Sequence, residues 1–277
     1  ALRDDFGPLA LTFWRWLIAA AVLAPFVWPG VRRQWPHLWP QLRRHWRLLA
    51  LLSLCTVVLF QTFIYIGLRT TMAINAVLIN SCMPVFILAC AWIMDGEKAR
   101  PRQVLGMVLS FAGIVVIVTR GEPARLAGIE FNLGDLWVLA AMPVWALYSV
   151  LLRRKPAELG GMALVFVLAA MGLCLLAPAY LLEMIWWIPQ RRPSAEALAG
   201  VIYIGLFASV GALACWNAGV SAVGASVAGF SVHLLPMFGT LLAMLLLGES
   251  LHLFHVAGFA TIVAGVVLAS LKRTDNG

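Results

Sequence analysis

Nine long apolar stretches, separated by short polar or Pro- and Gly-containing connections, make up most of the chain. They cover residues 8–29, 47–68, 72–94, 103–119, 134–152, 161–183, 197–218, 223–247 and 252–271. A helix of about 20 apolar residues crosses the ~30 Å hydrocarbon core of a bilayer and satisfies its own backbone hydrogen bonds there. The period-two alternation of a membrane β-strand is absent from the sequence. The pattern predicts an all-α, polytopic membrane bundle, with one transmembrane domain over residues 1–277.

Composition agrees with this class and narrows the chemistry. Hydrophobic residues are 62% of the chain and charged residues 12%, against roughly 25% charged in a soluble domain. The five cysteines all lie in apolar stretches and form no CxxC pair. We interpret them as small core residues and predict no metal site and no cofactor. A membrane enzyme would need a converging set of catalytic groups, and because the sequence offers none, we do not expect an enzyme.

The net charge of +8 is concentrated in alternate connections between the apolar stretches. Their basic residues are Arg32, Arg33, Arg43, Arg44, Arg47, Lys98, Arg100, Arg102, Arg153, Arg154, Lys155, Lys272 and Arg273. Because cytoplasmic connections carry an excess of Lys and Arg, this side and the C-terminus are predicted to be cytoplasmic, in a bacterial inner membrane. Charge placed in this way faces membrane lipid rather than nucleic acid. We expect a monomer.

The chain contains one pattern twice, at an offset of 152 residues. Pro84-x-Phe86, Gly96-Glu97, Gly106 and Gly113 recur as Pro236-x-Phe238, Gly248-Glu249, Gly258 and Gly265. An odd number of spans separates equivalent positions, so the repeats, 1–120 and 134–272, are predicted to insert with opposite orientations. Inverted repeats allow one central site to open to either side. Span 134–152 has no partner in the first repeat, so the symmetry predicts a tenth helix, coming first, that this chain lacks.

These repeated Pro-x-Phe, Gly-Glu and glycine motifs resemble the drug/metabolite transporter superfamily and, within it, the EamA-domain exporters. The resemblance covers essentially the whole chain. It implies ten helices in two five-helix halves and the export of small metabolites. Arg15 looks like the family's second-helix arginine, and Trp145 resembles the tryptophan of the helix that opens each half. The abundance of tryptophan and the overall run of the chain are similar to the YddG-type aromatic amino-acid exporters.

The motif residues have structural interpretations as well as functional ones. Gly106 and Gly113, like Gly258 and Gly265, are seven residues apart on one helical face, which favours close helix packing over ligand contact. Pro84 and Pro236 are predicted to kink their helices near mid-membrane, and the kink is either a fixed shape or a gate. Glu97 and Glu249 follow a glycine at a helix end, which is typical of a cap and loop contact, with proton coupling as the alternative.

Polar and aromatic residues deep in the spans are the candidate substrate-binding residues, because burying polar groups in hydrocarbon is costly. They are Asn80, Trp145 and His233 near the midplane, Gln61 and Tyr65 in the outer half of their span, and Tyr148 and Trp216 toward the cytoplasm. His233 is equivalent to Ser81, so the two are predicted to face one another across the pseudo-two-fold axis. For each candidate, an interhelical hydrogen bond or aromatic packing remains the alternative. Together they predict an aromatic cavity with neutral hydrogen-bonding groups.

The function that fits these features is a secondary transporter that works by alternating access. Its substrate is expected to be a small amphipathic metabolite, such as an amino acid, including aromatic ones. No carboxylate lies in the middle of a span, so we expect flux to follow the solute gradient. The alternatives are a lipid-handling or structural membrane protein, which would not explain the inverted repeat, and a membrane-embedded enzyme.

Overall fold

The structure, a computed structural model, describes residues 5–128, 130–186, 194–248 and 250–271. Every regular element in these ranges is a helix. Nine helical segments of the described residues are long and apolar enough to cross a membrane: Pro8–Arg44, Trp46–Gly67, Ala73–Asp95, Pro101–Val118, Leu133–Arg154, Gly161–Ile185, Ala195–Val223, Ala225–Leu246 and Leu253–Ser270. Each coincides with one apolar stretch of the sequence, which confirms the predicted all-α polytopic fold.

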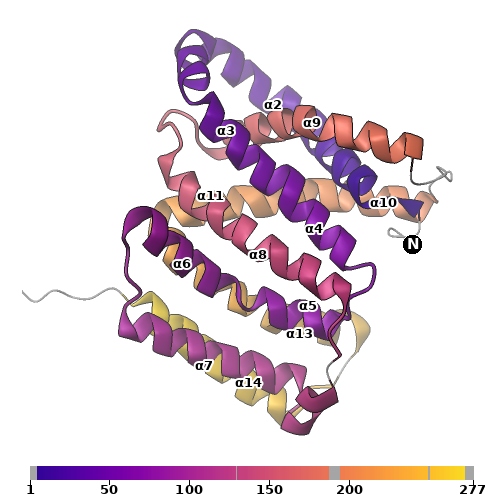
Figure 1. Cartoon of the computed structure of the whole chain (residues 1–277), viewed down its shortest axis with the longest axis vertical. Coiled ribbons are helices and arrows are strands. Elements are labelled where there is room, and N and C mark those ends of the chain that lie inside the picture. The colour runs from indigo at the N-terminus through magenta and orange to yellow at the C-terminus, as the bar shows by residue number, and fades with distance from the viewer. Residues whose placement is uncertain (1–4, 129, 187–193, 249, 272–277) are drawn as a thin grey trace, which may run out of the picture.

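Breaks divide several of these spans into shorter elements (Figure 1). The first part of the chain forms α2 (Pro8–Arg44), α3 (Trp46–Ser53), the π-helix η1 (Leu54–Leu59), α4 (Phe60–Gly67), α5 (Ala73–Asn80), α6 (Met83–Asp95) and α7 (Pro101–Val118). After the short η2 (Pro123–Gly128) come α8 (Leu133–Leu151), η3 (Leu152–Arg154), α9 (Gly161–Trp186), α10 (Ala195–Tyr203), the π-helix η4 (Ile204–Gly211), α11 (Ala212–Val223), α12 (Ala225–Phe230), η5 (Ser231–Leu234), α13 (Leu235–Leu247) and α14 (Leu253–Ser270). In Figure 1, α7 lies against α14 at one end of the molecule and α2 lies against α9 at the other.

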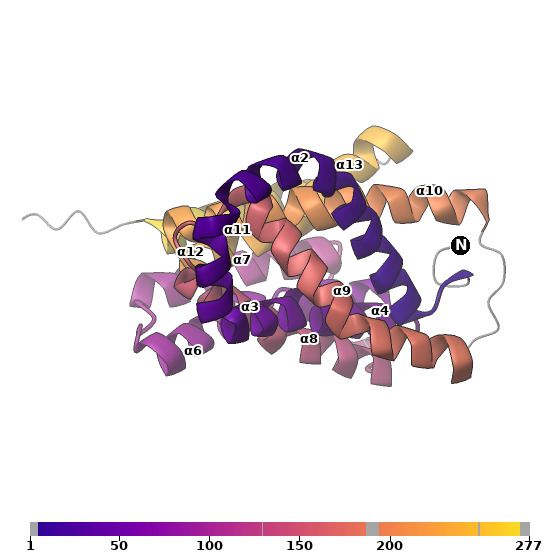
Figure 2. The same ribbon diagram turned by 90° about the horizontal axis from the view of Figure 1, so that it is seen from above.

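The first helix is longer than the sequence predicted. The span was expected to end near residue 29, with its arginines in a connection, but α2 continues to Arg44 and carries those arginines on helix. It does so although it contains Pro25, Pro29, Pro36 and Pro40. At 100° per residue these prolines fall within about 60° of one another around the helix axis. The missing hydrogen bonds therefore lie on one side, which bends the helix rather than ending it; Figure 2 shows α2 as an arch.

Corresponding elements of the two repeats begin and end at positions 152 residues apart. α6 and α13 cover equivalent residues, and so do α7 and α14. Gly96 and Gly248 cap α6 and α13 in the same left-handed conformation, each with a φ of 71°. The π-helices η1 and η4 also overlap once the shift is applied. The sequence repeat is thus preserved in the helix boundaries and caps.

α7 and α14 pack against each other through the four motif glycines. A Cβ on Gly106 would lie 2.4 Å from the carbonyl oxygen of Gly265, and one on Gly113 would lie 2.8 Å from that of Gly258. Gly106 meets Gly265 and Gly113 meets Gly258, so residue numbers that increase along α7 meet residue numbers that decrease along α14. The two equivalent helices are therefore antiparallel, as an inverted repeat requires. Small residues that let backbones approach are a common means of helix association in lipid. The geometry places the glycines in close packing between the repeats.

The motif prolines stand at helix breaks rather than at kinks in continuous helices. Pro84 and Pro236 are the second residues of α6 and α13, where a proline loses no intrahelical hydrogen bond. Before them, α5 has already ended at Asn80, and η5 interrupts the equivalent span. The prediction of a kink was therefore incomplete, because a polar turn precedes each proline and allows the helix to stop and restart.

α8 lies on the first repeat, and its counterpart would lie on the second. A Cβ on Gly67 would be 2.6 Å from the side chain of Val138 on α8, whereas the equivalent Gly219 has no described atom within 4 Å of such a position. The tenth helix that the symmetry predicts stays a prediction.

Candidate functional site

A buried arginine, Arg15 on α2, joins the two repeats. The residue is only 3% exposed. Its Nε donates to the hydroxyl of Ser209 on η4 over 2.8 Å, and its Nη1 donates to Gln61 Oε1 at 2.8 Å and to the Tyr65 hydroxyl at 2.6 Å. Gly205 lets η4 approach α2 here, because a Cβ at that position would lie 2.9 Å from the carbonyl oxygen of Arg15. The predicted pair Gln61 and Tyr65, one turn apart on α4, therefore meets Arg15 and Ser209 in one cluster.

No carboxylate among the described residues neutralises Arg15. All three side-chain partners offer neutral oxygens, and the ion pairs of the described chain lie elsewhere. The guanidinium carbon also lies 5.7 Å from the ring centre of Tyr65 and 5.8 Å from that of Trp16, within cation–π range. Burying a charge without a counter-ion is costly. The cluster is therefore suited to an anionic group that completes the charge balance.

Trp145 on α8 is the centre of a group of aromatic rings. Its ring centre lies 4.5 Å from that of Phe60, 5.3 Å from that of Tyr148 and 5.3 Å from that of Trp216. Tyr148 is fully buried, while Trp145 and Trp216 are partly exposed. These rings come from α4, α8 and α11, so the group spans both repeats. Phe60 also precedes Gln61 in the chain, so both groups include a residue of α4.

Polar groups accompany the aromatic rings. The Tyr148 hydroxyl donates to Asn217 Oδ1 at 2.5 Å, and the indole N–H of Trp216 donates to the hydroxyl of Ser149 at 3.2 Å. Nδ2 of Asn217 is buried, and no described atom accepts a hydrogen bond from it. Because a buried donor without a partner costs free energy, this amide would gain stability from an acceptor on a solute.

His233 and Asn80 lie at the two helix breaks. His233 is fully buried; its Nε2 donates to the carbonyl oxygen of Ser81 at 2.8 Å, and the hydroxyl of Ser110 donates to its Nδ1 at 2.5 Å. A carbonyl can only accept, so Nε2 carries the proton and both ring nitrogens are occupied. The contact between Ser81 and His233 crosses the pseudo-two-fold axis, as the repeat predicted. In this conformation His233 holds the breaks together, and partly exposed Asn80 is the last residue of α5, one position before Ser81.

Ser209 was not among the site residues predicted from the sequence. This serine lies in the π-helix η4, where its hydroxyl also donates to the carbonyl oxygen of Ile204, five residues earlier, over 3.1 Å. The wider turn of a π-helix shifts the register of the side chains that follow it, and such turns are frequent at functional sites. The available signal was a polar residue within an apolar span, but periodicity alone could not show that it faces Arg15.

Two buried carboxylates lie near span ends and have structural partners. Asp135, the third residue of α8, accepts hydrogen bonds from Thr71 and, at 2.9 Å, from Asn75. Glu183 accepts from two backbone N–H groups in the first turn of α2, the shorter bond being 2.7 Å. Carboxylates at a helix N-terminus stabilise its unpaired N–H groups. Both therefore fix helix ends in this conformation.

Ion pairs join the repeats at the opposite end of the helices. Arg153 Nη1 lies 2.5 Å from Glu97 Oε1, and Arg154 Nη2 lies 2.6 Å from Asp95 Oδ1. The carboxylates follow or end α6 in the first repeat, and the arginines belong to η3 in the second. The pair of Glu97 and Arg153 is the loop contact that was predicted as one interpretation of Glu97. Glu249, the residue equivalent to Glu97, lies outside the described residues.

Comparisons with known proteins agree with this architecture. The profile of the EamA-like transporter family matches residues 1–119 and again residues 132–271. An uncharacterized transporter from Archaeoglobus fulgidus is 27% identical over 275 residues, which cover 97% of this chain and 90% of that protein. A probable terminal-alkyne amino-acid exporter from Streptantibioticus cattleyicolor is 26% identical over 275 residues, covering 98% of this chain and 86% of that protein.

A solved crystal structure has the same fold. It is 24% identical, with a TM-score of 0.71, and the match covers 97% of this chain and 88% of that one. The two family matches, the nine membrane-spanning segments of the described residues and the transporter relatives all indicate a multi-pass membrane transporter for a small molecule, not an enzyme. The chain therefore belongs to the EamA-like transporter family.

Proposed function

We propose that this transporter exports a small amphipathic solute carrying a carboxylate and a flat apolar part, with aromatic amino acids included. It does so by alternating access at a central cavity between the two repeats. The observation that carries the proposal is Arg15, a buried cation whose described hydrogen-bond partners are all neutral. A substrate carboxylate supplies the missing negative charge.

Guanidinium and carboxylate are matched in charge and in hydrogen-bonding groups. Nε and Nη1 of Arg15 already donate to Ser209, Gln61 and Tyr65, so Nη2 is the donor that remains for a carboxylate. Charge-assisted hydrogen bonds between a guanidinium and a carboxylate are stronger than neutral ones. Such a bond contributes about 1.5–3 kcal/mol, which corresponds to roughly 10- to 100-fold in affinity. Gln61 and Tyr65 hold the guanidinium in place, so the Arg15 side chain loses little conformational entropy when the solute binds.

The apolar part of the solute is assigned to the aromatic group around Trp145. Phe60, Tyr148 and Trp216 surround this indole, and an added ring in such a setting is worth about 0.5–1.5 kcal/mol beyond its burial. Asn217 provides a buried amide donor beside the rings. The name of the Streptantibioticus relative supports an amino-acid substrate class, since every amino acid brings a carboxylate.

The remaining parts of the proposal concern orientation and energy. We assign the basic end and the C-terminus to the cytoplasm of a bacterium, with the protein in the inner membrane as a monomer. The excess of Lys and Arg at that end supports this orientation. We also propose that flux follows the solute gradient, because Asp135 and Glu183 are occupied in fixing helix ends.

The experiment is counterflow in proteoliposomes with two labelled aromatic solutes, phenylalanine and phenethylamine, which differ by the carboxylate. The wild-type protein is expected to transport phenylalanine. Arg15→Gln is expected to weaken its apparent affinity for phenylalanine at least tenfold and to change phenethylamine transport much less. Arg69→Gln removes an exposed arginine and is the control. Variants are compared at equal reconstituted amounts and equal melting temperature.

Two outcomes would overturn the proposal. One is the absence of flux for phenylalanine and for every other amino acid tested with the wild-type protein. The other is an Arg15→Gln variant that transports phenylalanine as the Arg69→Gln control does. The first removes the substrate class, and the second removes Arg15 as the carboxylate anchor.

A further inference from the structure

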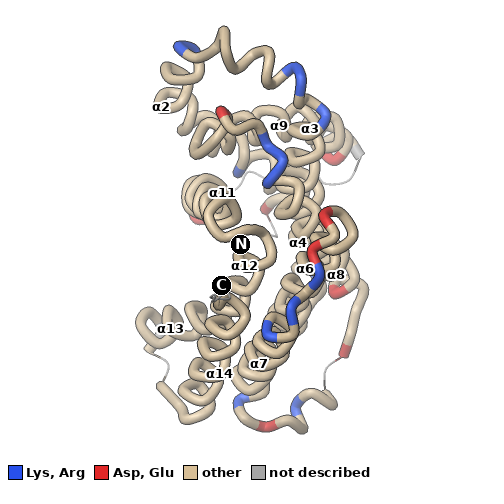
Figure 3. The backbone as a smooth tube through the Cα atoms, turned by 90° about the vertical axis from the view of Figure 1, so that its left-hand side faces the viewer, with Lys and Arg blue, Asp and Glu red and all other residues tan. Residues whose placement is uncertain are grey.

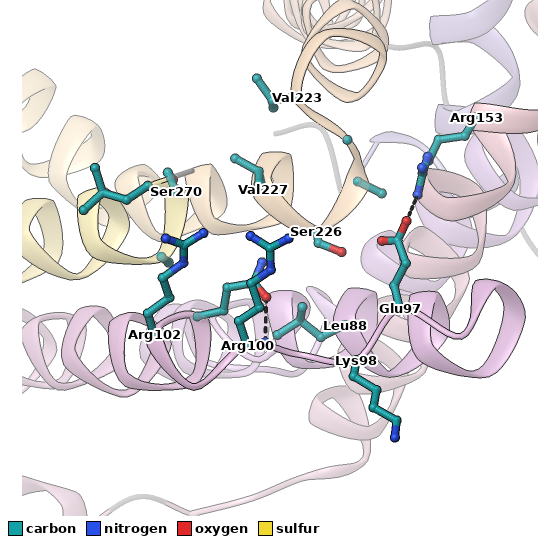
Figure 4. Close-up of a pocket in the computed structure, with 15 residues that line it drawn as sticks. Leu88, Glu97, Lys98, Arg100, Arg102, Arg153, Val223, Ser226, Val227 and Ser270 are labelled. Carbon is teal, nitrogen blue, oxygen red and sulfur yellow. Dashed lines mark hydrogen bonds and ion pairs between the residues drawn. The ribbon is translucent and has the colours of Figure 1, made fainter. Parts of the chain in front are cut away.

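A cavity lies away from the Arg15 cluster, at the end of the molecule that carries the α6–η3 ion pairs. It has a volume of about 490 Å³ and is formed by both repeats. Its walls are the α6–α7 connection and the start of α7 on one side, and α12, the end of α14 and η3 on the other (Figure 4). The principal polar residues are Glu97, Arg100, Arg102, Arg153, Ser226 and Ser270.

The lining has a large excess of positive charge. It includes Lys98, Arg100, Arg102 and Arg153, with Glu97 as its one carboxylate among the residues that the structure describes. Glu97 is already paired with Arg153. None of the other three cations takes part in an ion pair of the described chain. Figure 3 shows these cations gathered between the ends of α6 and α7.

Two of these side chains are directed over the cavity, and of the two Arg100 is exposed and Arg102 is half-buried. In Figure 4, Arg100 and Arg102 rise from the start of α7 toward Ser226 and Ser270, while Lys98 points away. An excess of basic residues on one side is general in membrane proteins. That tendency accounts for the number of cations but not for two guanidinium groups directed into one cavity beside two hydroxyls.

The pseudo-symmetry supplies an independent comparison. A cavity of about 420 Å³ lies at the inverted position and is lined by Ser250, His252, Phe254 and His255, with Gly248 and Arg120. The first four are the equivalents of Lys98, Arg100, Arg102 and Gln103. The same helix packing is thus built with a serine, two histidines and a phenylalanine in the other repeat. The cluster of permanent cations is therefore not a requirement of the fold.

We infer that the cavity between α7, α12 and α14 binds a phosphate group, anchored by Arg100 and Arg102 and by the hydroxyls of Ser226 and Ser270. Arginine is suited to phosphate because its planar fork presents parallel N–H donors. Basic pockets between transmembrane helices at the cytoplasmic side bind anionic lipid headgroups. Val223 and Leu271 on the same wall are exposed apolar side chains, which suits the glycerol and acyl carbons of a phospholipid. A soluble phosphate ester shares the same anionic group.

The binding test uses the purified full chain in detergent and does not depend on transport. Native mass spectrometry measures adducts with phosphatidylglycerol, a lipid phosphate, and with glycerol 3-phosphate, a soluble one. The double variant Arg100→Gln/Arg102→Gln is compared with Arg32→Gln/Arg33→Gln, which removes the same charge from exposed positions of α2. We expect the wild-type protein and the α2 control to bind phosphatidylglycerol, and the cavity variant to bind it at least tenfold more weakly.

A second variant keeps the test decisive if the double variant does not fold. Ser226→Glu places a carboxylate inside the cavity near the start of α12, where acidic residues suit a helix, and it leaves both arginines in place. Its expected effect is the same loss of binding. If glycerol 3-phosphate binds with this dependence and the lipid does not, the phosphate comes from a soluble ester. Equal binding by the cavity variants and the α2 control, or no binding of either probe, would refute the site.

Discussion

Gly106→Ala is expected to destabilise the protein through the contact between α7 and α14. A Cβ at this position would lie 2.4 Å from the carbonyl oxygen of Gly265 and 2.7 Å from the backbone nitrogen of Ala269, while ordinary contacts begin at 3.4 Å. Both neighbours are backbone atoms and cannot rotate away. α14 must therefore move about 1 Å from α7, and overpacking of this kind costs about 1–3 kcal/mol.

A matched control separates this clash from the intrinsic effect of the substitution. Alanine favours a helix interior over glycine by up to about 1 kcal/mol, and Gly30 on α2 has no atom within 4 Å of an added Cβ. We expect Gly30→Ala to raise the free energy of unfolding by about 0.4–1 kcal/mol and Gly106→Ala to lower it by about 1–2 kcal/mol. Gly258→Ala is expected to cost less than Gly106→Ala, because its nearest backbone neighbour, the carbonyl oxygen of Gly113, would lie 3.0 Å from the added Cβ, compared with 2.4 Å for the backbone neighbour of Gly106.

The free energy of unfolding can be measured by adding sodium dodecyl sulfate to the protein in mixed micelles and following tryptophan fluorescence. The informative quantity is the difference between the two alanine variants, which cancels most of the helix-propensity effect. If Gly106→Ala is as stable as Gly30→Ala, the backbones of α7 and α14 do not approach as closely as the structure shows.

Three further predictions test other contacts. Because the Glu97 and Arg153 side chains are 42% and 41% exposed, a double-mutant cycle of Glu97→Gln and Arg153→Gln is expected to give a coupling energy below about 1 kcal/mol; a larger value would mean that the pair is effectively desolvated. His233→Ala removes a buried side chain and leaves the Ser81 carbonyl without its donor, while the Ser110 hydroxyl can still donate to the carbonyl oxygen of Met107. We therefore expect the same unfolding titration to show a loss of about 2–4 kcal/mol, and an unchanged stability would contradict the buried contact. Trp145→Ala is expected to weaken counterflow of phenylalanine several-fold while alanine transport changes less; equal losses with a lowered melting temperature would assign Trp145 to packing.

Most of the fold could be predicted because hydrophobic length and repeated glycines report directly on membrane helices. The nine spans follow from runs of apolar residues, and the close helix packing at the motif glycines follows from their spacing on one helical face. The helix C-termini could also be predicted, because glycine readily adopts the positive φ that Gly96 and Gly248 have at the ends of α6 and α13. These features depend on local sequence and on symmetry, both of which are present in the printed chain.

Other features depend on contacts between distant segments and were not visible. The sequence suggested that the first span ends near Pro29, because prolines usually end a helix and nothing in the local sequence shows that this helix continues past four of them. It named Gln61 and Tyr65 but did not join them to Arg15, since that meeting depends on the angle between α2 and α4. Ser209 was missed because a π-helix changes the register on which any face assignment rests.

The two repeats agree in their packing residues and differ in their polar ones, and this difference bears on how a solute is held. The positions equivalent to Arg15, Gln61, Tyr65 and Ser209 are Val167, Leu213, Asn217 and Val57. The cationic cluster therefore occurs once, whereas the glycine contacts between α7 and α14 occur twice. Alternating access requires that both sides can open, which a duplicated framework provides. A single charged anchor, in contrast, would give the proposed solute one polar end and one orientation, with its carboxylate held by the same residues whichever side is open.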